Sequence, residues 1–140
     1  MSTELSTLNK TYGDEDFDRF YAVSRYLIQV GQLHTAEVIL KGLTAVRPDK
    51  ALGWLGRCYL HAFQAEFEEL LDAARQGLKA EPRDVGLRIF LIIGLFALGD
   101  IAAAGTELGE VGELLELSPP EDAAVYRLYK SQLARYQNQR

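Results

Sequence analysis

The chain has 140 residues and a formal net charge of −5, and its composition, 48% hydrophobic and 25% charged, suits one soluble domain with a continuous core. The acidic balance argues against nucleic acid or an anionic membrane as the main partner, because both need a basic footprint. Cys58 is the single cysteine, so the chain can form no internal disulfide. The polar N-terminus lacks a signal-peptide pattern, and the longest apolar run, 87–98, is too short to span a bilayer. We therefore expect a cytoplasmic protein.

Apolar residues recur at the helical spacings i, i+3, i+4 and i+7 along almost the whole chain, and this pattern predicts helices rather than strands. Residues 1–13 are expected to form a flexible N-terminal segment. Asp14 is a candidate N-cap for a first helix that reaches about Val30, and Gly31 then turns the chain into a second helix over about 33–46. Pro48 closes this unit, because the residue before a proline is pushed out of the helical region.

The same arrangement follows twice more along the chain. Helices are predicted over about 50–63 and 66–80, and then from Asp84, a candidate cap, to Leu98 and from 101 to about 117. Ser118 and Glu121 fit a capping box before a closing helix over about 119–137. That helix has one apolar and one charged side, which suits the end of a helical stack.

A ladder of residues 34 apart runs through about 100 residues without a gap. One rung holds Gly31, Ala65 and Gly99, and others hold Ala36, Leu70 and Ala104, and Leu40, Ala74 and Leu108. This period is typical of stacked helical hairpins, and on these residues the chain resembles the tetratricopeptide repeat family. The resemblance implies an all-α, right-handed solenoid of three hairpins plus a closing helix. It places repeats at about 17–50, 51–84 and 85–118 in a single domain of residues 14–139.

The sequence departs from the family's repeat pattern at four positions, and the resemblance has one consequence for function. The repeat pattern is broken at Arg57, His61, Arg88 and Glu116. In this family the first helix of each repeat lines a concave groove that binds polypeptides, and the residues so implied are Tyr21, Arg25, Ile28, Leu52, Leu55, Tyr59, Phe63, Ile89, Ile93 and Phe96. Apart from Arg25, the Lys, Asn and Arg residues of the family's carboxylate-clamp subtype are missing from these positions, so binding of a terminal carboxylate of that kind is not expected.

Apolar and aromatic residues dominate this implied groove, which predicts a partner with an apolar extended or helical segment. Size, closing helix and groove also resemble the small tetratricopeptide chaperones of bacterial type III secretion. That resemblance implies a cytoplasmic chaperone that sequesters apolar segments of a secretion substrate or component, with a role in protein transport and virulence. The alternative is a constitutive scaffold subunit of a complex unrelated to secretion. A groove filled by the N-terminal segment, by the last helix or by a second copy in a homodimer also stays open.

The sequence contains no set of residues that predicts catalysis. His34, His61 and Cys58 lack the spacing of metal ligands, and Cys58 is expected to act as a small core residue. No phosphate-binding loop is present. We therefore expect no enzyme activity, no cofactor and no metal. Three glycines in the sixth helix are expected to admit a neighbouring helix at close range: Gly105, Gly109 and Gly112.

Overall fold

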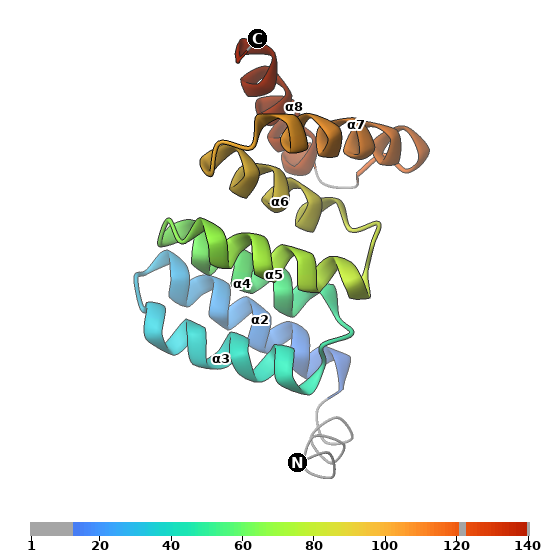
Figure 1. Ribbon diagram of the computed structural model, residues 1–140. Coiled ribbons are helices and arrows are strands. Elements are labelled where there is room, and N and C mark those ends of the chain that lie inside the picture. Colours follow the sequence, from blue (N-terminus) through green and yellow to red (C-terminus); the bar gives the residue numbers. More distant parts are fainter. Residues whose placement is uncertain (1–12, 121–122, 140) are drawn as a thin grey trace.

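The structure, a computed structural model, describes residues 13–120 and 123–139 (Figure 1). Every regular element in these two ranges is an α-helix, as predicted. The helices are α2 (Asp14–Gln29), α3 (Leu33–Val46), α4 (Ala51–Phe63), α5 (Phe67–Ala80), α6 (Val85–Ala97), α7 (Ile101–Leu117) and α8 (Ala123–Asn138).

The helices form three consecutive hairpins, α2–α3, α4–α5 and α6–α7, stacked one after another with α8 at the far end (Figure 1). The first helices of the hairpins contact one another in the order α2, α4, α6, and each second helix packs on the first helix of the next hairpin. The closing helix α8 packs against both α6 and α7. Because contacts join only neighbouring units, the molecule is a solenoid of three hairpins and a closing helix, as predicted.

The turn inside each hairpin has the same backbone geometry. Gly31, Ala65 and Gly99 all have positive φ, at 83°, 57° and 84°. The residue after each of them donates its N–H to a carbonyl five residues back, at 2.8–2.9 Å, and this bond defines a Schellman motif. The 34-residue ladder therefore marks three equivalent helix ends. One of them has alanine at a positive φ that glycine would adopt at lower conformational energy.

The other rungs of the ladder form the core. Ala36, Leu40, Leu70, Ala74 and Ala104 have no exposed surface, and Leu108 is almost fully buried. These residues divide between two clusters. One joins the first hairpin to Leu60 of α4, and the other runs through the second and third hairpins to the closing helix. Burial of each leucine contributes about 1.5–3 kcal/mol, so the stacking of the hairpins is what stabilises the fold.

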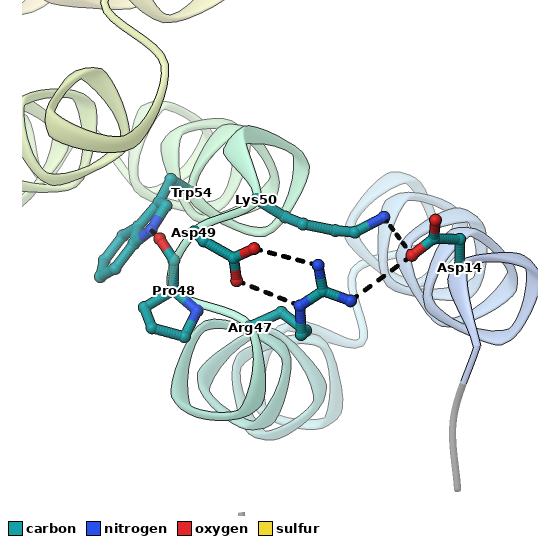
Figure 2. A network of polar contacts seen from close by, with 6 residues as sticks. All are labelled: Asp14, Arg47, Pro48, Asp49, Lys50 and Trp54. Atoms are coloured by element: carbon teal, nitrogen blue, oxygen red, sulfur yellow. Dashed lines mark hydrogen bonds and ion pairs between the residues drawn. The ribbon is translucent and has the colours of Figure 1, made fainter. Parts of the chain in front are cut away.

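A hydrogen bond between the loop and the next helix recurs at the same place in two units. The Trp54 indole N–H donates to the Pro48 carbonyl at 2.9 Å, and Arg88 Nε donates to the Pro82 carbonyl, also at 2.9 Å. Figure 2 shows the first of these bonds. Trp54 and Arg88 are 34 residues apart, so the arginine that breaks the repeat pattern in sequence makes the same bond as the tryptophan.

The expected cap at Asp14 is wrong. Gly13 is the N-cap of α2, and Asp14 is the first helical residue. Its carboxylate lies 2.7 Å from Lys50 Nζ and 3.4 Å from Arg47 Nη1, which joins α2 to the loop after α3 (Figure 2). The Lys50 ammonium, with Arg47, lowers the pKa of Asp14 below its usual value. Asp84 does cap α6, since its Oδ1 accepts the Leu87 N–H at 2.8 Å.

The predicted close approach of a neighbouring helix is found at two of the three glycines, and that helix is α8. A Cβ at Gly105 would lie 2.7 Å from the Tyr136 ring, and one at Gly112 would lie 2.9 Å from the Tyr129 hydroxyl, both on α8. A Cβ at Gly109 would meet nothing within 4 Å, so the expectation was wrong there. The predicted capping box depends on Glu121, which lies outside the described residues.

Candidate functional site

The residues implied as groove-lining fall into two groups in the structure. Ile28, Ile89 and Phe96 are only 5%, 1% and 4% exposed, so they contribute to the core and offer almost no surface to a partner. The other seven are partly or well exposed, and we call them the inner surface: Tyr21 and Arg25 on α2, Leu52, Leu55, Tyr59 and Phe63 on α4, and Ile93 on α6.

The inner surface has an aromatic and cationic centre where α2 meets α4. The Arg25 guanidinium carbon lies 3.3 Å from the centroid of the Tyr59 ring, and Arg25 Nη1 donates to the Tyr21 hydroxyl at 3.0 Å. Burial raises the pKa of Tyr21 above its usual value, although Arg25 opposes that shift. The Tyr21 hydroxyl is therefore neutral at physiological pH, and Arg25 is the charged group of this cluster.

The surface continues from α4 to α6 through close contacts. The Tyr59 ring packs edge-on against Phe90, with centroids 4.6 Å apart. A Cβ at Gly86, at the start of α6, would lie 3.2 Å from Leu55. Glycine at this position thus leaves Leu55 room beside α6, and Leu55 keeps part of its side chain exposed.

The closing helix packs on the end of the third hairpin, against both α6 and α7. Arg135 of α8 lies 4.8 Å from the centroid of the Phe96 ring, while Tyr129, Leu133 and Tyr136 pack against the larger core cluster. This contact helps to explain why Phe96 is buried. Sequence reasoning missed Arg135, because it stands on the charged side of the predicted helix. The open part of the inner surface is therefore concentrated on the first two hairpins.

Several hollows lie away from the inner surface, and two of them are formed by helices of the first two hairpins. One, between α2 and α3, is mostly apolar and is lined by Phe17, Phe20, Val38, Ile39, Gly42, Leu43, Val46 and Arg47. The other lies among α3, α4 and α5 and is polar, with His61 Nδ1 3.0 Å from Glu66 Oε1 at its edge. The first hollow supplies a second apolar surface, at the N-terminal end of the stack.

The histidines and the cysteine have no common site. Cys58 is fully buried, and burial raises the pKa of its thiol to about 12. Over residues 13–120 and 123–139, no three His, Cys, Asp or Glu side chains gather in a way that could hold a metal ion. No helix in the same ranges is long and apolar enough to cross a membrane.

Comparison with solved structures shows the same fold. The type III secretion translocator chaperone SycD of Yersinia enterocolitica superposes with a TM-score of 0.79 at 15% identity, over 91% of this chain and 96% of its own. PcrH, solved in complex with the chaperone-binding region of PopB, gives 0.73 at 18%, over 84% and 94%. The Sgt2 tetratricopeptide domain of Aspergillus fumigatus gives 0.71 at 13%, over 87% and 80%.

These neighbours define the chain as a right-handed tetratricopeptide-type α-solenoid, as the sequence predicted. No protein-family model matches the sequence, and no curated protein matches it. SycD has also been solved with a peptide of the translocator YopD, so the fold is one that binds peptides in at least one close structural neighbour.

Proposed function

We propose that this protein is a peptide-binding chaperone that acts in the bacterial cytoplasm. Its inner surface would hold an apolar segment of a type III secretion substrate or component before export. The observation that carries the proposal is the row of partly exposed aromatic and aliphatic side chains on α2 and α4, ending in Phe63, which is 58% exposed. Apolar surface of this kind, on a scaffold built from rigid helices, is typical of an interaction site.

The mechanism would be sequestration. Covering apolar client surface gains about 25 cal/mol for each Å² removed from water, and only the part that exceeds the entropy cost of association appears as affinity. A few anchors beside Leu55 and Tyr59 would supply most of it. While it is bound, that segment of the client could not associate with another client molecule. The fold neighbours SycD and PcrH, solved with translocator segments, support this choice of client class.

The test compares glutamate substitutions inside and outside the inner surface. Leu55→Glu and Phe63→Glu should abolish capture of the client from a lysate of the native host, identified by mass spectrometry. Leu117→Glu is the matched control, because Leu117 is 81% exposed at the end of α7. Phe63→Glu is included because Phe63 is more exposed than Leu55, so a charge there should disturb the fold less.

The captured client is then reconstituted with the purified protein. Protection of one apolar client segment from proteolysis, lost with both inner-surface variants and kept with Leu117→Glu, would support the chaperone. Equal capture by all four proteins would contradict it. A permanent multiprotein complex in place of one exported client would favour the scaffold alternative, and a dimer that occludes the inner surface would favour self-association.

A further inference from the structure

Arg25 is the arginine of the inner surface, where it is partly buried against two tyrosine rings. Three arginines away from the inner surface have carboxylate partners within 3.0 Å: Arg19 pairs with Glu15, Arg47 with Asp49, and Arg88 with Glu107 and Glu110. Arg25 has no carboxylate within 4.0 Å among residues 13–120 and 123–139. The same holds in these ranges for Arg57, Arg75, Arg83, Arg127 and Arg135, but none of these five belongs to the inner surface. An arginine that keeps its charge beside aromatic rings is available for a partner outside the chain.

The guanidinium of Arg25 is partly buried, and a partly buried charge without an ion-pair partner is unfavourable unless a ligand binds it. The guanidinium is stacked on Tyr59, and the Tyr21 hydroxyl is its one hydrogen-bond acceptor within the described residues. A guanidinium carries five N–H donors, so most of them face solvent or a ligand. Stacking on tyrosine fixes the plane of the group, which leaves a fork suited to a carboxylate.

No carboxylate of the inner surface competes for this fork. Asp84 acts electrostatically on Tyr21, but its Oδ1 accepts the Leu87 N–H and it forms no ion pair with Arg25. In a chain of net charge −5, this local positive group therefore selects a carboxylate at one defined place rather than attracting acidic proteins in general.

We propose that Arg25 binds an acidic side chain of the client, next to the apolar residue that packs on Tyr59 and Leu55. This inference rests on the proposed function and specifies its ligand. Arg25 lies over the Tyr59 ring, and Leu55 is one helical turn from Tyr59. A client carboxylate at Arg25 and an apolar client side chain at Leu55 should therefore lie on one face of the client, about 5–6 Å apart. That separation corresponds to positions i and i+2 in an extended segment, or i and i+3 or i+4 in a helical one.

The experiment is a selection from a random peptide library displayed on phage, with the full-length protein as bait. We expect peptides selected by wild type to be enriched in Asp or Glu at one of these spacings from an apolar residue. Selection with Arg25→Gln should lose the acidic enrichment and keep the apolar one. Arg75→Gln, an exposed site on α5, removes the same charge away from the inner surface and should select like wild type.

Affinities of selected synthetic peptides then measure the contact. Replacing the acidic residue by its amide should weaken binding to wild type about tenfold, and should leave binding to Arg25→Gln nearly unchanged. Thermal melts of the variants confirm that they are folded. Selection of purely apolar peptides that Leu55→Glu fails to bind would overturn the role of Arg25 and leave the proposed function standing. Failure to select any peptide that depends on Leu55 would overturn both.

Discussion

Ala65 holds a backbone conformation that an alanine adopts at a cost. Its φ of 57° lies in the left-handed region, at the turn where the equivalent residues of the other hairpins are Gly31 and Gly99. The Glu66 N–H still bonds to the His61 carbonyl at 2.8 Å, so the Schellman motif forms in spite of the side chain. We expect Ala65→Gly to stabilise the protein.

The change in the free energy of unfolding caused by Ala65→Gly is the difference between two opposing contributions. A non-glycine residue in the left-handed region costs about 1–2 kcal/mol, which the substitution relieves. Glycine also loses about 0.4–1 kcal/mol more conformational entropy on folding than alanine does. The free energy of unfolding should therefore rise by about 0.5–1 kcal/mol, and the midpoint of thermal unfolding by about 2–4 °C.

The assay is urea denaturation followed by circular dichroism at 222 nm, with Gly31→Ala as the matched control. A Cβ at Gly31 would meet nothing within 4 Å, so this reverse substitution tests backbone strain alone. It should lower the free energy of unfolding by about the amount that Ala65→Gly adds. If Ala65→Gly leaves stability unchanged while Gly31→Ala destabilises, the strain assigned to Ala65 is absent.

Two further predictions concern glycine contacts and the thiol. Gly77→Ala should destabilise by about 1–3 kcal/mol, because its Cβ would lie 2.8 Å from Trp54 Cβ, whereas Gly109→Ala, in open space on α7, should stabilise by about 1 kcal/mol. The same denaturation assay checks both variants. Changes in the free energy of unfolding that have the same sign for Gly77→Ala and Gly109→Ala would refute the packing argument. Cys58 should resist iodoacetamide in the folded protein, because it is fully buried with a pKa of about 12, and should react in urea; mass spectrometry that finds rapid alkylation of the folded chain would contradict this burial.

The fold could be predicted because its determinants repeat in the sequence. The 34-residue ladder placed Leu40, Leu70 and Ala104 at equivalent sites, and all three are fully buried. Helix ends agreed with the predicted ones to within a residue where a glycine turn or a proline marked them. Asp14 was misplaced because an acidic residue favours both the N-cap and the first turn, and sequence alone did not separate the two positions.

The site was less predictable because it depends on what covers each position. Repeat numbering assigned Ile89 and Phe96 to the groove, but it carries no information about which neighbours bury each position, such as Arg135 of α8 beside Phe96. At Arg88 the residue type departs from the repeat pattern, but the structural role is kept. Its side chain donates to the Pro82 carbonyl as Trp54 donates to the Pro48 carbonyl one repeat earlier. A long side chain with an N–H donor is enough at that position, and a hydrophobicity pattern does not detect it.

Under the proposed function, the extent of the inner surface limits the size of the segment that the protein would hold. Packed helices lie about 8–10 Å apart, so a path across α2, α4 and the exposed edge of α6 spans about 20 Å. An extended chain rises about 3.3 Å per residue, and such a path accommodates about six residues. With Arg25 near one end and Ile93 near the other, we expect the bound segment to be short and to carry its acidic residue toward the α2 side.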